Sequence, residues 1–160
     1  MKETAVSYCF EGLDPGPYRH LFSFDDAELA QQGIVRMTVD SPRGFPCRVT
    51  LAEAQPGDNV LLLNHVSRTD AGPYRATHAI FVSKSGSAAA RYLDEIPPAL
   101  ATRQLSLRAF DAAGMMVAAM LTEPGAAEDG LLTLLDNPAV VEVDAHNAVR
   151  GCFAARARRV

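Results

Sequence analysis

Residues 103–121, RQLSLRAFDAAGMMVAAML, contain the clearest structural signal in the chain. Apolar residues alternate with polar or small ones on each side of a short loop that includes Gly114. This alternation has the period of a β-strand, and a glycine can adopt the left-handed conformation that a tight hairpin loop needs. The segment therefore predicts a β-hairpin with strands over residues 103–110 and 115–121.

Two further segments predict helices. Asp25 followed three residues later by Glu28 is a capping box, which predicts a helix over residues 25–32. Leucines repeat on one face of a helix drawn over residues 124–135, although Gly130 inside this segment disfavours a helix. Both helices are expected to be short.

Strands dominate the rest of the chain. They are expected over residues 4–10, 34–39, 47–51, 60–64, 76–82, 139–145 and 151–157. Residues 65–75 are polar and interrupted by Gly72 and Pro73, so they are expected to form a loop. Many short strands with few helices predict an α+β fold with a mainly antiparallel sheet and two or three short helices.

The length and composition favour one soluble domain over residues 1–160. Hydrophobic residues make up 48% of the chain, which is enough for a core, and no linker or repeat divides it. The first residues lack the apolar stretch of a signal peptide, and the longest apolar run, residues 112–121, is too short to span a membrane. Three widely spaced cysteines do not suggest a disulfide framework, so a cytoplasmic protein is expected.

The charged residues narrow the choice of partner. A net charge of -4 argues against general nucleic-acid binding, which needs a clustered positive surface. The chain has thirteen arginines and two lysines. Arginine makes paired contacts with carboxylates and phosphates, but codon bias in an alanine-rich chain explains the count equally well. Only the positions of particular arginines therefore indicate function.

No standard catalytic motif is present: the chain has no glycine-rich phosphate loop, CxxC, HExxH or GxSxG sequence. The first candidate segment is GFPCRVTL, residues 44–51, in which Cys47 and Arg48 lie on opposite faces of the expected strand. Cys47 is a candidate nucleophile if a neighbouring histidine or arginine lowers its pKa. The alternative, which we favour, is that Cys47 is a small buried hydrophobic residue.

The second candidate segment is NHVSRTDAGPYRATHAIFV, residues 64–82. Its expected loop contains Tyr74 and Arg75, together with further arginine and histidine residues, and this content suits the capture of a small anion. The alternative is a solvated loop whose charges pair with one another.

The third candidate segment is VEVDAHNAVRGCFAARARRV, residues 141–160. Alternation along a strand places Glu142, Asp144 and His146 on one face, where Asp144 could orient His146 as a carboxylate orients a catalytic base. The alternative is an exposed sheet edge that leads into a turn. The arginines from Arg156 onward are expected to be solvated.

A metal site is the weakest candidate. His65, His78 and His146 could act as ligands with a carboxylate, but they lack the close spacing of typical metal-binding histidines. We therefore predict no metal and no cofactor.

The candidate segments, taken together, resemble the bacterial domain-of-unknown-function family 1203. The resemblance extends over nearly the whole chain and rests on the phrases LFSFDDAELA, GFPCRVTL, VLLLN, GPYRATHAIFV, LSLRAFDAAGMMV and HNAVRGCFAARAR. The activity of that family is unknown, so the resemblance implies candidate residues but no reaction. These candidates are Cys47, Arg48, Tyr74, Arg75, Arg108, His146, Asn147, Arg150 and Cys152.

The favoured hypothesis is a binding or catalytic site for a small carboxylate or phosphate. Arg48, Arg75, Arg108 and Arg150 would hold the anion, with Tyr74 and Asn147 beside it and His146 as acid or base. Whether the protein is an enzyme is left open. The alternative is a non-enzymatic interaction module or a homo-oligomeric structural protein, such as a homodimer, that uses the methionines of the hairpin.

Overall fold

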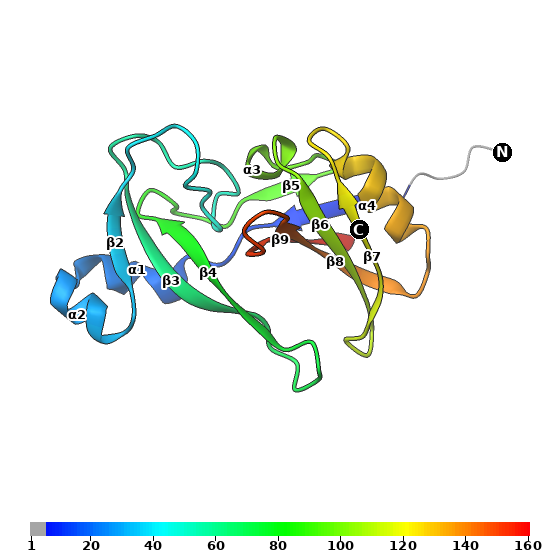
Figure 1. Ribbon diagram of the computed structural model, residues 1–160, viewed down its shortest axis with the longest axis horizontal. Helices are drawn as coiled ribbons and strands as arrows, with labels where there is room; N and C mark the ends of the chain where they lie inside the picture. The colour runs from blue at the N-terminus through cyan, green and yellow to red at the C-terminus, as the bar shows by residue number, and fades with distance from the viewer. Residues whose placement is uncertain (1–5) are drawn as a thin grey trace.

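The computed structural model describes residues 6–160 (Figure 1). Within them, the predicted α+β class with mainly antiparallel sheets is confirmed, and the strands form one sheet of six and one of three. Residues 4 and 5 of the first predicted strand lie outside the described residues. No helix in residues 6–160 has the length and apolar character needed to cross a membrane.

The larger sheet has the strand order β5-β1-β9-β8-β6-β7, and every neighbouring pair is antiparallel. Its strands are β1 (Tyr8–Glu11), β5 (Arg91–Leu93), β6 (Leu105–Asp111), β7 (Met116–Thr122), β8 (Val140–Asn147) and β9 (Phe153–Arg159). The predicted hairpin is confirmed as β6 and β7, and Gly114 in its loop has a positive φ of 76°. Since β8 lies between β6 and β9, it is an interior strand.

The smaller sheet has the order β2-β3-β4 and lies beside the larger one (Figure 1). Its strands are β2 (Val35–Thr38), β3 (Asn59–Arg68) and β4 (Ala76–Ser83). The strand β3 continues to Arg68, although a loop was expected from residue 65. Its polar end is paired with β4 and so forms a regular ladder in which His65 is opposite His78.

Short helices connect the strands. They are α1 (Gly16–Arg19), the 3-10 helix η1 (His20–Ser23), α2 (Asp26–Gln31), α3 (Pro98–Ala101) and α4 (Ala127–Leu135). The capping box predicted for α2 is confirmed: Glu28 N donates to the Asp25 side chain, and Asp25 N donates to Glu28 Oε2, each at 2.8 Å. The single-turn helices α1 and α3 were missed because four residues are too few to show a helical period.

The two faces of the larger sheet differ in chemistry. One face presents Leu105, Leu107 and Val143 to the buried leucines of α4, and together they form the main core. Gly130 allows this packing, because a Cβ at this position would collide with Thr122 of β7. The opposite face, built on alternate residues of β6, β8 and β9, is largely polar.

The expected strand over residues 47–51 is wrong. This segment is a turn in which Leu51 N donates to Cys47 O, and Leu51 has a positive φ of 54°. Isolated bridges from Pro46 to Glu53 and from Cys47 to Phe81 flank the turn. Cys47, Val49 and Leu51 are therefore buried without strand geometry, which the composition of the segment alone does not reveal.

Candidate functional site

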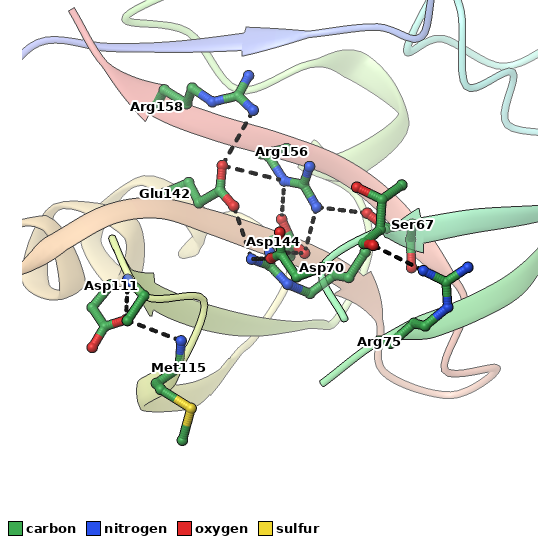
Figure 2. Close-up of polar contacts among 12 residues, drawn as sticks. Ser67, Asp70, Arg75, Asp111, Met115, Glu142, Asp144, Arg156 and Arg158 are labelled. Carbon is green, nitrogen blue, oxygen red and sulfur yellow. Dashed lines mark hydrogen bonds and ion pairs between the residues drawn. The ribbon is translucent and has the colours of Figure 1, made fainter. Parts of the chain in front are cut away.

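An ion-pair cluster, formed by Arg68, Glu142, Asp144 and Arg156, lies where the end of β3 meets β8 and β9 (Figure 2). Asp144 accepts hydrogen bonds from Arg68 Nη1 at 3.0 Å and from Arg156 Nε at 2.6 Å. Glu142 accepts one from Arg68 Nη2 at 3.0 Å. Asp144 is completely buried, so this carboxylate is compensated by two arginines inside the protein.

The ion-pair cluster joins the two sheets. Arg156 donates through Nη2 to the backbone oxygen of Ser67 at 2.7 Å, and the Arg68 guanidinium lies 3.5 Å from the centre of the Phe110 ring. Burial tends to lower the pKa of Arg156, but the neighbouring Asp144 and Glu142 carboxylates raise it above its usual value. These arginines are neutralised by the protein itself and are not free to hold an anion.

This arrangement corrects three expectations about the third candidate segment. Asp144 does not orient His146, because both of its oxygens accept from arginines and no hydrogen bond joins it to the imidazole. The exposed-edge alternative is also wrong, since Asp144 is buried on an interior strand. Arg156 was expected to be solvated, but its cross-strand partner is Asp144.

His146 is itself almost completely buried. Its Nδ1 lies 3.1 Å from the backbone oxygen of Gly151, which can only accept, so Nδ1 carries the proton and Nε2 carries the lone pair. Burial lowers the pKa of His146 to about 4, and the positive charge of Arg108 adds to this effect. His146 is therefore a neutral imidazole at pH 7, with its ring 4.8 Å from that of His78.

The His146 cavity encloses about 230 Å³. It is lined by Ser67, Arg68, Pro73, Tyr74, Arg75, Ala76, Arg108, Phe110, Met116 and His146. Arg108 donates through Nε to Ser106 Oγ at 3.2 Å and forms no ion pair within residues 6–160. Arg75 donates to the backbone oxygen of Thr69 at 2.8 Å (Figure 2). This cavity thus combines three arginines, of which Arg68 is paired within the ion-pair cluster, with a neutral histidine.

The Arg48 cavity is larger, at about 850 Å³. Its polar lining comprises Asp40, Ser41, Arg43, Arg48, Arg103, Gln104, Asn147, Arg150 and Cys152. Arg48 is only 3% exposed and donates to the backbone oxygens of Phe153 at 2.7 Å and Pro46 at 2.6 Å, and to Cys152 Sγ at 3.3 Å. Burial lowers the pKa of Arg48, and no carboxylate of the described residues contacts it.

Cys47 lies in neither cavity. Its side chain is buried in a core cluster with Val49 and Leu61, and its sulfur accepts a hydrogen bond from Ser83 N at 3.3 Å. This placement fits the packing alternative, because an attacking sulfur must be accessible to its substrate.

The predicted site residues therefore fall into separate places. Tyr74, Arg75, Arg108 and His146 line the His146 cavity. Arg48, Asn147 and Arg150 line the Arg48 cavity. The four arginines expected to hold one anion are thus divided between two cavities, two in each.

Sequence reasoning missed the ion-pair cluster. The charges at alternate positions were visible, acidic at Glu142 and Asp144 and basic at Arg156 and Arg158. In the sheet, Glu142 is opposite Arg158 and Asp144 is opposite Arg156. Opposite charges on facing strands favour pairing, so this signal was usable once the two segments were assumed to be neighbours.

The three candidate metal ligands do not form a metal centre. Within residues 6–160, no group of three or more histidine, cysteine, aspartate or glutamate side chains has a metal-binding arrangement. His65 Nδ1 is paired with the Tyr18 hydroxyl at 3.2 Å, and His78 Nδ1 with Ser67 Oγ at 2.9 Å.

These features define an α+β protein with two antiparallel sheets, an ion-pair cluster between them and several arginine-lined cavities. The chain belongs to the family described as "Protein of unknown function (DUF1203)", whose model matches residues 44–159. The Arg48 and His146 cavities draw most of their lining from the matched region. No curated protein and no solved structure matches the chain.

Proposed function

We propose that the protein binds a small carboxylate or phosphate anion in the His146 cavity. The observation that carries this proposal is the state of Arg108, which lines the cavity and forms no ion pair within residues 6–160. A guanidinium in a partly enclosed site interacts more strongly with an anion than it would in open water. Arg75, from the neighbouring loop, adds a second positive charge.

His146 determines which kind of ligand group can lie beside the anion. Its Nε2 is an acceptor, so the group next to the anion's negative oxygens should be a hydroxyl or an N–H that donates to this nitrogen. A bound anion would also raise the pKa of His146, because nearby negative charge favours the imidazolium. Binding below neutral pH would then be accompanied by proton uptake. A hydroxy acid or a phosphate monoanion has both required features.

The test is isothermal titration calorimetry at low ionic strength with inorganic phosphate and with malate as probes. We expect one binding site per chain, and we expect Arg108→Gln to weaken binding by at least about tenfold, since hydrogen bonds to charged groups contribute roughly 1.5–3 kcal/mol. The matched control is Arg91→Gln, which removes an exposed arginine from the edge strand β5. Equal affinities for the Arg108→Gln and Arg91→Gln proteins would contradict the proposal.

A homodimer through β7 is the second candidate, and it rests on an apolar edge strand. β7 has a neighbour on one side only, and its Val117 and Leu121 are exposed, Leu121 by 65%. Met116 and Met120 of the same strand are half-buried, and Met120 packs against the main core. An unpaired apolar edge favours pairing with another strand. Light scattering after gel filtration should then give a dimer that Leu121→Lys converts to a monomer.

We place this function in the cytoplasm, because Cys9, Cys47 and Cys152 are all free thiols. Free thiols are typical of proteins that stay in a reducing compartment.

A further inference from the structure

Cys152 occupies a different environment from the other two cysteines. Cys9 and Cys47 are buried and line neither cavity. Cys152 is half-buried, follows the turn after β8, and lines the Arg48 cavity. Cys152 is therefore the cysteine that borders a space large enough for a small molecule.

Two N–H groups point at this sulfur. Arg48 Nη2 lies 3.3 Å from Cys152 Sγ, and Asn147 Nδ2 lies 3.2 Å from it. Sulfur accepts both hydrogen bonds, and a thiolate accepts them more strongly than a thiol. The arrangement stabilises negative charge on Sγ.

The charge balance of Arg48 points the same way. Its other donors are directed at the neutral backbone oxygens of Phe153 and Pro46. A buried cation without an anionic partner is costly. Among the groups that Arg48 contacts within residues 6–160, Cys152 Sγ is the one that can become negative.

The rest of the cavity indicates the class of molecule that reaches Cys152. Arg43 and Arg150 are exposed and form no ion pair with the described residues, whereas Arg103 is paired with Glu53. Asp40 is the acidic side chain of the lining, so the lining is positive overall. The buried oxygen Asn147 Oδ1 has no hydrogen-bond partner within residues 6–160.

We propose that Cys152 is a site of thiol–disulfide exchange with small disulfides that carry carboxylates, such as glutathione disulfide. The Cys152 thiol first loses its proton to solvent. The thiolate Sγ then attacks one sulfur of the disulfide and forms a new S–S bond, while the original S–S bond breaks and the other half leaves as a thiolate with the bonding electron pair. A second thiol reverses the step, so the modification follows the ratio of small disulfides to thiols.

The experiment compares two aromatic disulfides on the native protein: the dianionic dithiobis(nitrobenzoate) and the uncharged dithiodipyridine. We expect one fast-reacting thiol per chain with both reagents, followed over time by the absorbance of the released aromatic thiol. Cys152→Ser should abolish the fast phase. Rapid quenching and peptide mapping of the wild-type adduct identify the modified residue even if this variant does not fold.

The arginines provide the selective test. Arg150→Gln should slow the anionic reagent roughly threefold, and Arg43→Gln together with Arg150→Gln about tenfold, because each removes an attractive charge near the sulfur. The uncharged reagent should react at an unchanged rate, and Arg91→Gln should affect neither. The proposal is overturned if no thiol reacts in the native protein, if the adduct lies on Cys9 or Cys47, or if both reagents slow equally. The residues tested here do not line the His146 cavity, so its failure and that of the anion site are distinguishable.

Discussion

The ion-pair cluster and the Arg48 cavity each contain an arginine that is almost completely buried, Arg68 at 6% exposed and Arg48 at 3%. The guanidinium of Arg68 contacts three carboxylates, those of Asp70, Glu142 and Asp144. The guanidinium of Arg48 contacts two backbone oxygens and a cysteine sulfur. In the ion-pair cluster, carboxylates neutralise the arginine. In the Arg48 cavity, the arginine keeps its positive charge beside a space that a ligand can enter.

The different partners of Arg68 and Arg48 show how an arginine with a structural role can be distinguished from one that is a candidate for ligand binding. Burial does not separate them, because both side chains are buried to nearly the same degree. What separates them is whether the protein supplies the counter-charge. By this criterion Arg48 and Arg108 remain candidates for function, while Arg68 and Arg156 hold the two sheets together.

Breaking the ion-pair cluster should have the largest effect on stability. Asp144→Asn removes the carboxylate between Arg68 and Arg156, and we expect the free energy of unfolding to fall by about 3–5 kcal/mol, as for other buried pairs that lose one partner. Urea denaturation measures this change. The matched test is the double variant Asp144→Asn with Arg68→Met, which removes one of the stranded charges and should recover part of the loss. If the single variant lost less than about 1 kcal/mol of unfolding free energy, Asp144 would not be the buried counter-charge of Arg68 and Arg156.

The second-largest effect is expected from low pH, which should destabilise the folded protein by protonating His146. Because its pKa is about 4 in the folded protein and about 6.5 when unfolded, the unfolded state binds more protons between these values. The contribution of His146 to stability is therefore complete above pH 6.5 and is lost as the pH falls toward 4, by about 2 kcal/mol at pH 5. Urea denaturation at pH 7 and pH 5 should show this loss in the wild type and in His20→Asn, which changes an exposed histidine. His146→Gln should lose less between the two pH values, and an equal loss in all three proteins would contradict the assignment.

The smallest effect is expected at the rim of the ion-pair cluster. Asp70 contacts Arg68 at 3.3 Å but is 59% exposed, so water screens the pair. Asp70→Asn should lower the free energy of unfolding by less than about 0.5 kcal/mol, measured as for Asp144→Asn. A loss comparable to that of Asp144→Asn would mean that exposure does not distinguish the two carboxylates.

Local signals in the sequence predicted the elements whose geometry depends on near neighbours. The capping box over Asp25 and Glu28 formed as expected, and so did the hairpin around Gly114, because its loop and its alternation lie within one short segment. The turn at residues 47–51 and the extension of β3 to Arg68 were not predicted, since both involve pairing with β4, which follows later in the chain. Cys47 N donates to Ala52 O, and Cys47 forms an isolated β-bridge with Phe81. The end of β3 pairs with β4.

The sequence by itself determined the α+β class, the candidate residues and the opposite charges on alternate positions of β8 and β9. It did not determine which arginines would share a cavity, because Arg48 and Cys152 are more than a hundred residues apart and meet only through tertiary packing. The counter-charge of each arginine was decided in the same way: Arg108 and Arg156 both lie opposite Asp144 in the sheet, but Arg156 bonds to its carboxylate whereas Arg108 bonds to Ser106. Coulomb interactions depend on distance in space and on the surrounding dielectric, and both are set by the folded structure.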